Sequence, residues 1–311
     1  MARTIQVTAP PDQTEALVRL ARETEGVVAV RLERGGSLVP PGDVLTVDAT
    51  NRAAHDLFRA FDARGVARSA ATAVTTSEPY SVVAPAGQDL IDGDTNDATW
   101  EEVSTAIRAS TNMRANALLL MAASGVLAAV GLATDAVELV IAAMVIAPEF
   151  QPLVQTSLGV VSRSASTARA GAGHVAVGWL AMAGAALVTA FLLRASGQDP
   201  LGGGGAYLPA GSLVSYYTTI SATTLATDTA AATAGAVLLA SRRTALTAGV
   251  SIALPLVPLT ALAGVALVAG EADVLQTALL RWTLDAAIVL GASAAVLAWK
   301  RATVLHRSLL P

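Results

Sequence analysis

The pattern of hydrophobic and polar residues divides the chain into two parts. Residues 1–80 alternate short β-branched runs with segments whose apolar residues recur every three or four positions. The first pattern is typical of strands and the second of amphipathic helices. Strands are predicted over residues 4–8, 27–33, 44–49 and 66–76, and helices over 12–23 and, after a cap at Thr50 or Asn51, 54–61. This βαββαβ order predicts an α+β ferredoxin-like domain with two helices on one face of a four-stranded antiparallel sheet.

The rest of the chain is dominated by long apolar stretches. A helix needs about 20 residues to cross the hydrocarbon core of a bilayer. Six stretches predict a membrane α-helical bundle: 115–134, 136–162, 174–193, 213–241, 245–269 and 275–299. The expected parts are a cytoplasmic ferredoxin-like domain (1–80), a linker with a helix on the membrane surface (81–112), a six-span membrane domain (113–301) and a cytoplasmic tail (302–311).

Composition supports this division and narrows the function classes. Of the 311 residues, 53% are hydrophobic and 14% are charged, whereas an average soluble domain carries roughly 25% charged residues. The first 115 residues hold 27 of the 44 charged side chains, with 11 Arg against 16 acids and no basic stripe. A nucleic-acid partner is therefore not expected. Cysteine is absent, which excludes disulfides and cysteine nucleophiles.

The basic residues between the predicted spans indicate their orientation, because short loops rich in Arg and Lys stay on the cytoplasmic side. Such residues follow spans two, four and six: Arg163, Arg169, Arg242, Arg243, Lys300, Arg301 and Arg307. The first residues lack the apolar run of a secretory signal. We therefore expect a multi-pass protein of the cell (inner) membrane with both termini in the cytoplasm.

Two of the spans are interrupted by pairs of prolines. Pro148 and Pro152 lie in the second span, and Pro255 and Pro258 lie in the fifth. Proline leaves backbone carbonyls without a helical partner, and in lipid these carbonyls need protein or a water-lined cavity. Both spans are therefore predicted to contain broken helices.

The two interrupted segments also correspond to each other. Residues 146–153 and 252–259 share Ile, Ala, Pro and Leu at the same offsets, and the six-span arrangement makes the segments antiparallel. Paired broken helices of this kind indicate an inverted repeat with a transporter site. The alternative is a pair of kinked structural helices.

The same segments resemble a known family. Residues 142–152 read Ala-Ala-Met-Val-Ile-Ala-Pro-Glu-Phe-Gln-Pro and resemble the Gly-Ala-Met-Leu-Ile-Ala-Pro-Leu-Met-Gly-Pro hallmark of the domain of unknown function 389 family, hydrophobic membrane proteins of bacteria and archaea. Residues 249–258, Gly-Val-Ser-Ile-Ala-Leu-Pro-Leu-Val-Pro, resemble the second motif of that family. The resemblance spans residues 99–300 and implies a small soluble domain joined to a membrane region, but no activity. Glu149 and Gln151 replace apolar or glycine positions of the family pattern.

Polar residues inside the spans are the candidate functional residues, because an ionisable group at mid-bilayer costs roughly 2.5–3.5 kcal/mol on insertion scales. Glu149 lies beside the carbonyls that the prolines free, a combination that suits a cation or a proton. Asp228 lies among threonine hydroxyls. The predicted substrate or ion path consists of Glu149, Gln151, Asp228, Thr224 and Thr227.

A further charged pair is expected to be structural. Arg281 and Asp285 lie four residues apart, so they share one helix face and are predicted to form an intramembrane ion pair. Abundant small residues, such as Gly171, Gly173, Gly178 and Gly184, favour close helix packing or a homo-oligomer.

These features favour a transporter or channel for an ion or small solute, with a regulatory or assembly role for the soluble domain. The alternative is a membrane-anchored sensor or scaffold whose spans do not transport. Hydrolase motifs such as His-Glu-x-x-His and Gly-x-Ser-x-Gly are absent, so we expect neither an enzyme nor catalytic residues, and no metal site or cofactor. The expected partners are the lipid bilayer, other copies of the chain and an unidentified solute or ion.

Overall fold

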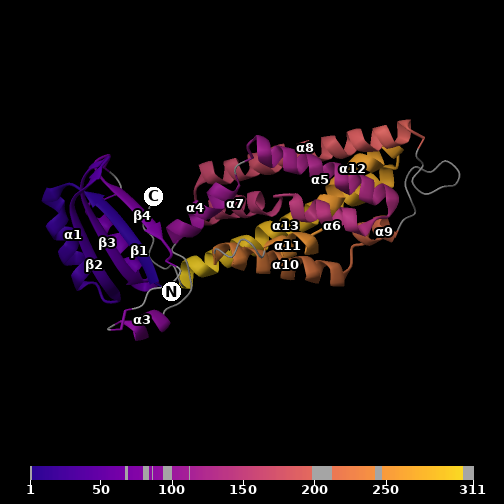
Figure 1. Ribbon diagram of the computed structural model, residues 1–311. Helices are drawn as coiled ribbons and strands as arrows, with labels where there is room; N and C mark the ends of the chain where they lie inside the picture. Colours follow the sequence, from indigo (N-terminus) through magenta and orange to yellow (C-terminus); the bar gives the residue numbers. More distant parts are fainter. Residues whose placement is uncertain are drawn as a thin grey trace. The chain divides into compact units, whose positions relative to one another are not determined.

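The computed structural model describes residues 2–66, 69–79, 84–85, 87–93, 100–111, 113–197, 212–241 and 247–303. The chain forms two compact units: the described residues of the N-terminal unit lie within 2–100, and those of the membrane unit lie within 101–303. Figure 1 shows strands in the N-terminal unit and helices throughout the described part of the membrane unit.

The N-terminal unit is a four-stranded antiparallel sheet with two main helices. Its elements are β1 (Ala2–Ala9), α1 (Pro11–Glu23), β2 (Val27–Leu38), β3 (Pro41–Thr50), α2 (Asn51–Asp62) and β4 (Ala73–Ser77). The strand order is β2-β3-β1-β4, so β1 pairs with both β3 and β4. The order of elements along the chain agrees with the sequence prediction.

One hydrophobic core holds this unit together. Alternate residues of β1 and β3, such as Ile5 and Val47, are paired in register and buried against Leu17 of α1 and Leu57 and Phe61 of α2. Period-two burial in the strands and period-3.6 burial in the helices are the patterns from which the elements were predicted. The core lies wholly within residues 5–66 and the partly buried residues packed on it.

Element ends in this unit depart from prediction in a few places. The Thr50 hydroxyl accepts a hydrogen bond from the Ala53 amide at 3.2 Å, so Thr50 caps α2. The last strand begins at Ala73 instead of residue 66, because the Val66 amide donates to the Phe61 carbonyl and closes the end of α2. Within the expected linker, residues 88–92 form the short helix α3 (Gln88–Asp92).

The membrane unit is helical wherever it contains regular structure. Its helices are α4 (Trp100–Ser110), α5 (Ala115–Thr134), α6 (Val137–Ile146), α7 (Phe150–Val161), α8 (Ala165–Ala195), α9 (Ser212–Thr218), α10 (Ala222–Ala240), α11 (Thr247–Ala253), α12 (Leu256–Ala269) and α13 (Ala272–Thr303). Among the described residues, α5, α8 and α13 are long and apolar enough to cross a membrane. The α6–α7 pair, bent by 43°, gives a fourth span if counted as one. These apolar helices indicate a membrane protein, and the arrangement of six spans remains a prediction.

The predicted spans are interrupted at three places. The proline-containing segments break between α6 and α7 and between α11 and α12, as the prolines predicted. The predicted fourth span is also broken, between α9 and α10, which was not expected. The third begins at Ala165, nine residues earlier than predicted, so little chain separates α7 from α8.

Glycines allow the helices of this unit to approach closely. A Cβ atom at Gly125 of α5 would lie 2.2 Å from the Met182 carbonyl oxygen of α8, and one at Gly159 of α7 would lie 2.2 Å from the Ala168 amide nitrogen of α8. A Cβ atom at Gly171 of α8 would lie 2.6 Å from the Thr156 amide nitrogen of α7, and one at Gly178 would lie 3.1 Å from Met121 Cε of α5, whereas Gly173 and Gly184 have open space beside them. Only part of the predicted small-residue set therefore contributes to packing among the described residues.

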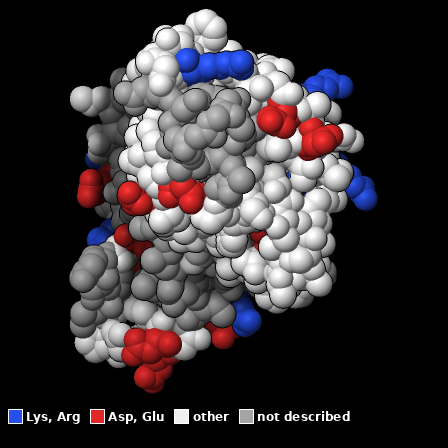
Figure 2. All heavy atoms as spheres, turned by 90° about the vertical axis from the view of Figure 1, so that its right-hand side faces the viewer, with Lys and Arg blue, Asp and Glu red and all other residues white. Residues whose placement is uncertain are grey.

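The outward faces of these helices are apolar. Leu119 of α5, Leu180 and Phe191 of α8, and Trp299 of α13 are each more than half exposed. Such contiguous apolar exposure is unusual for a soluble domain and suits a surface that meets lipid. On the face shown in Figure 2, the basic side chains stand singly, and the described residues form no basic patch there.

The two halves of the membrane unit pack in corresponding ways. α5 contacts α8 in the first half, and α10 contacts α13 in the second. Across the halves, α8 contacts α12 and α13 contacts α7, while α6 contacts α11. In Figure 1, α7 lies to the left of α6 whereas α12 lies to the right of α11, so the two broken pairs run in opposite directions.

An arginine near the C-terminal end of α8 and another near the C-terminal end of α13 join the halves. Arg194 of α8 donates a hydrogen bond to the Val268 carbonyl in the last turn of α12. Arg301 of α13 donates to the Val161 carbonyl, the last residue of α7. A cation at a helix C-terminus is favoured by the helix dipole and by the unpaired carbonyls there.

Candidate functional site

A cavity of about 510 Å³ lies within the membrane unit. The wall on one side is polar and consists of Thr223, Thr224, Thr227 and Asp228 of α10 and Arg281 of α13. The other walls are mainly apolar and come from α6, from α9, and from the end of α11 with its break. A concave site with apolar walls and a few convergent polar groups is the usual form of a small-molecule site.

The polar wall begins where α9 ends and α10 starts. Ser221 is the N-cap of α10: its hydroxyl accepts from the Thr224 amide at 3.2 Å, and the Thr224 hydroxyl accepts from the Ser221 amide at 3.0 Å. This reciprocal capping box satisfies two backbone donors that a new helix would leave unpaired. The break is therefore encoded locally by hydroxyl side chains, without a proline.

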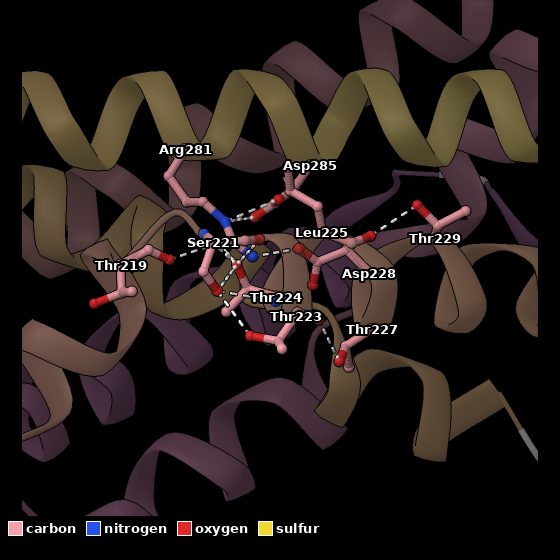
Figure 3. A network of polar contacts seen from close by, with 10 residues as sticks. All are labelled: Thr219, Ser221, Thr223, Thr224, Leu225, Thr227, Asp228, Thr229, Arg281 and Asp285. Carbon is pink, nitrogen blue, oxygen red and sulfur yellow. Dashed lines mark hydrogen bonds and ion pairs between the residues drawn. The ribbon is translucent and has the colours of Figure 1, made fainter.

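Arg281 forms the centre of the polar network in Figure 3. Its Nε atom donates to both oxygens of Asp285 at 3.0 Å, and its Nη2 atom pairs with the Asp228 carboxylate. Its Nη1 atom donates to the Thr219 carbonyl and to the Thr224 hydroxyl, each at 2.7 Å. Arg281 thus contacts its own helix, α10 and the break between α9 and α10.

The charges of this network do not cancel when both acids are ionised. Arg281, Asp228 and Asp285 are each at most 2% exposed. A buried charge is tolerated when it is paired and hydrogen-bonded, but one guanidinium compensates only one carboxylate. Asp228 lines the cavity, whereas Asp285 is fully enclosed. With both acids ionised, the excess negative charge would border the cavity at Asp228.

Asp135 fixes the apolar wall that α9 supplies. This residue ends α5 in the left-handed conformation, with φ 53°. Its carboxylate accepts hydrogen bonds from the Leu213 amide at 3.0 Å and from the Ser212 hydroxyl at 2.8 Å. These two bonds, first that from the Leu213 amide, lower the pKa of Asp135 below its ordinary value of 3.8. The short helix α9 is thereby attached to the turn between α5 and α6.

Glu149 does not line this cavity; it lies at the break between α6 and α7. Its side chain is 1% exposed, and neither carboxyl oxygen has a hydrogen-bond partner among the described residues. The Ser251 hydroxyl of α11 approaches the carboxyl without meeting hydrogen-bond geometry. The Oε1 atom of Gln151 is likewise buried without a partner among them. Neither side chain is among the residues that line the cavity.

The second proline of each broken pair holds the same place, and the first prolines differ by one position. Pro152 is the third residue of α7, and Pro258 is the third residue of α12. Pro148 precedes α7 by two residues, and Pro255 is the residue directly before α12. In the first turn of a helix a missing amide hydrogen costs little, so each proline pair defines where the second helix begins.

The structure divides the predicted site residues into two groups. It brings Asp228, Thr224 and Thr227 together with Arg281 at the cavity, and it leaves Glu149 and Gln151 at a separate buried break. Two features of the cavity were not predicted from the sequence: the tyrosines of α9 in its wall and the contact between Arg281 and the Thr219 carbonyl. The Ser-Ala-Thr-Thr run that starts at Ser221 is the signal that could have revealed the break.

Comparison with known proteins yields one finding. Residues 144–297 match the family model "Domain of unknown function (DUF389)", which confirms the resemblance inferred from the two proline motifs. No curated protein and no solved structure matches the chain.

Proposed function

We propose that this chain, whose membrane unit belongs to the DUF389 family, moves an ion or a small solute across a membrane through the cavity beside Asp228. The observation that carries the proposal is the charged and hydroxyl-lined wall of that cavity. Charged groups inside membrane segments are costly and commonly mark a substrate or ion path.

The placement of the cavity supports this function. It lies between α6, α11 and the break between α9 and α10, so broken helices contribute to its walls. In transporters, broken helices from two antiparallel halves typically form the substrate site. The antiparallel course of the α6–α7 and α11–α12 pairs fits that architecture.

The proposal includes six spans in the cell (inner) membrane with both termini in the cytoplasm. The spans are α5, the α6–α7 pair, α8, α9 with α10, the α11–α12 pair, and α13. The Arg and Lys residues after spans two, four and six support this orientation. We assign the two halves to an inverted repeat on the basis of their corresponding helix contacts.

For the N-terminal unit we propose a ferredoxin-like domain with a regulatory or assembly role. The βαββαβ order and the strand order β2-β3-β1-β4 support this assignment. The fold class hosts many functions and selects none of them. A homo-oligomer assembled in the bilayer is part of this proposal, as is the absence of catalytic activity and of a resident cofactor.

Flux into proteoliposomes tests the transport proposal. Vesicles with and without the protein are placed in solutions of labelled sodium, potassium, ammonium, neutral amino acids or small amines, and the uptake of each solute is measured. We expect at least one of these solutes to enter faster with the protein, and Asp228→Asn to abolish the difference because it removes the carboxyl group that lines the cavity. The control is Glu138→Gln, an exposed carboxyl in the first turn of α6, which leaves the flux unchanged.

A sensor or scaffold is the second candidate, and one observation favours it. Asp228 and Thr224 both already bond to Arg281, as purely structural groups would. Because the chain lacks cysteine, Thr227→Cys gives a single thiol on the cavity wall. A charged, water-soluble thiol reagent modifies this thiol if solutes reach the cavity. A thiol that stays unmodified, together with equal flux in all vesicles, would favour the sensor or scaffold.

A further inference from the structure

The Glu149 carboxyl has an unusual environment. It is 1% exposed, and both of its oxygens lack a hydrogen-bond partner among the described residues. The carboxylates of Asp228 and Asp285, by contrast, contact Arg281. An isolated ionised carboxylate in an apolar interior is so costly that the group instead takes up a proton.

The packing around Glu149 is close and apolar. Glu149 is followed by Phe150, which is fully buried. A Cβ atom at Gly235 of α10 would lie 2.5 Å from Phe150 Cζ and 2.8 Å from Val250 Cγ1 of α11. Three helices therefore meet at the break, and they leave the carboxyl with the Ser251 hydroxyl as a nearby polar group.

No charged side chain of the described residues neutralises Glu149. On the facing helices, Asp228 and Asp285 both bond to Arg281, and His174 of α8 bonds to Gln155 of α7. Other charged residues of the surrounding helices lie toward helix ends, in α6, α8 and α13: Glu138, Arg169, Arg194, Asp273, Lys300 and Arg301. Helices α11 and α12 carry none.

One local feature favours the ionised form. Glu149 occupies the N-cap position of α7, a helix of 12 residues. The N-terminus of a helix presents unpaired amide hydrogens and a positive dipole end, both of which stabilise a negative charge. Burial and the helix terminus thus act in opposite directions on the protonation of the same carboxyl.

From this geometry we infer that Glu149 is a proton-binding site: its carboxyl holds one proton while the break is closed and gives it up when the break opens to water. A metal cation fits less well, because hard cations take several oxygen ligands and the described residues place only the Ser251 hydroxyl near this carboxyl.

The site has a direct structural connection to the cavity. Met144 of α6, on the other side of the break, lines the cavity, and so does Ile252, the neighbour of Ser251 on α11. Movement at the break would therefore alter both places. That proton uptake at Glu149 is coupled to solute movement rests on the transport function proposed above, whereas proton binding itself does not.

Labelling with dicyclohexylcarbodiimide tests the site without requiring transport. This apolar reagent reacts with protonated carboxyls in lipid, and at neutral pH ordinary surface carboxyls are ionised. The full-length protein in liposomes is treated at several pH values and the modified residue is located by mass spectrometry. We expect Glu149 to be labelled at neutral pH, with labelling that falls as the pH rises.

Three comparisons make the result decisive. Glu149→Gln should lose the label while retaining its fold, and Glu138→Gln should keep it. Glu149→Asp, which retains a carboxyl, covers the case in which the glutamine variant is unstable, and it should be labelled. Sodium at high concentration should not protect the site.

Absence of label on Glu149 in the folded protein, or protection by sodium, overturns the proton assignment. The flux experiment is read separately. If Glu149 is labelled but no solute is transported, the proton site is supported and the transport proposal is contradicted. If a solute is transported but Glu149 is not labelled, the transport proposal is supported and the proton site is contradicted.

Discussion

At the scale of single residues, Arg281 joins four other residues of the membrane unit through its guanidinium group. Its guanidinium contacts two carboxylates, one hydroxyl and one backbone carbonyl. A planar fork of five donors suits such a set, whereas a lysine ammonium does not. The residue therefore holds α13 against α10 and also closes the break before α10.

The sequence predicted only part of this arrangement. The spacing of four residues between Arg281 and Asp285 is local, and a helix alone brings them into contact. Asp228 and Thr219 lie 53 and 62 residues away from Arg281 in the chain. Their contacts depend on how α10 packs on α13, which helical periodicity does not specify.

We predict that Arg281→Gln destabilises the protein. The change leaves two buried carboxylates and the Thr219 carbonyl without their donor, and loss of one partner of a buried pair costs about 3–5 kcal/mol in soluble proteins. The melting temperature of the protein in detergent is therefore expected to fall.

A combined variant separates charge from shape in this network. Arg281→Gln together with Asp228→Asn and Asp285→Asn leaves no uncompensated charge, so we expect it to recover most of the lost stability. A single Arg281→Gln variant as stable as the wild type would contradict the role given to this residue.

At the scale of elements, the breaks in the helices show what the sequence reveals and what it hides. Proline marked the breaks before α7 and before α12, because a missing amide hydrogen is visible in the sequence. The break between α9 and α10 depends on Ser221 and Thr224 hydroxyls and on Arg281 from a distant helix. This break could not be predicted from hydrophobicity, because residues 213–241 form one continuous, mainly apolar stretch of the sequence.

The attachment of α9 is expected to depend on pH through Asp135. Its folded pKa is lowered, so the contact stabilises α9 above the ordinary value of 3.8 and is lost as the pH falls through the lower folded value. The protection factor of the Leu213 amide, which compares its exchange rate with that of an unstructured peptide at the same pH, should therefore stay high at neutral pH and fall in acid.

Asp135→Asn is the matched variant, because asparagine tolerates the left-handed backbone that this position requires. It lacks the negative charge, so we expect faster exchange of the Leu213 amide already at neutral pH. Glu138→Gln, three residues on, should leave the exchange unaltered. Equal exchange in the wild type and in Asp135→Asn would disprove the attachment.

The contact of α5 with α8 requires a glycine at one position. An added methyl at Gly125 would meet the Met182 carbonyl oxygen at 2.2 Å, and overpacking of this kind costs about 1–3 kcal/mol. Gly125→Ala should therefore lower the melting temperature. Gly184→Ala is the control, since open space surrounds Gly184 and alanine favours the helix. A similar response of both variants would refute the packing argument.

At the scale of the whole molecule, the two units differ in how much the sequence determines. In the N-terminal unit, alternation and helical spacing predicted each of the four strands and both main helices, with errors confined to their ends. In the membrane unit, apolar length located the helices, but uniform hydrophobicity gave little information on which faces pack together. The cavity forms between those faces. Its polar residues Asp228, Thr224 and Thr227 were therefore predicted from the sequence, but their arrangement around Arg281 was not.

The topology can be tested on either side of α8. The chain contains no cysteine, so Ser164→Cys and Ser196→Cys each introduce one thiol at an end of this helix. In vesicles of one orientation, an impermeant thiol reagent should label Ser164→Cys from the cytoplasmic side and Ser196→Cys from the opposite side. Labelling of both from one side would exclude α8 as a span.

The bonds from Arg194 to the end of α12 and from Arg301 to the end of α7 have a mechanical consequence. α8 thereby restrains α12, and α13 restrains α7, so each bond joins one half of the membrane unit to the second helix of the other half's broken pair. The first helices of the two broken pairs, α6 and α11, contact each other and end at the breaks. If these bonds hold α7 and α12 in place, a relative movement within the membrane unit would occur at the breaks beside Glu149 and Pro255, and it would reorient α6 and α11.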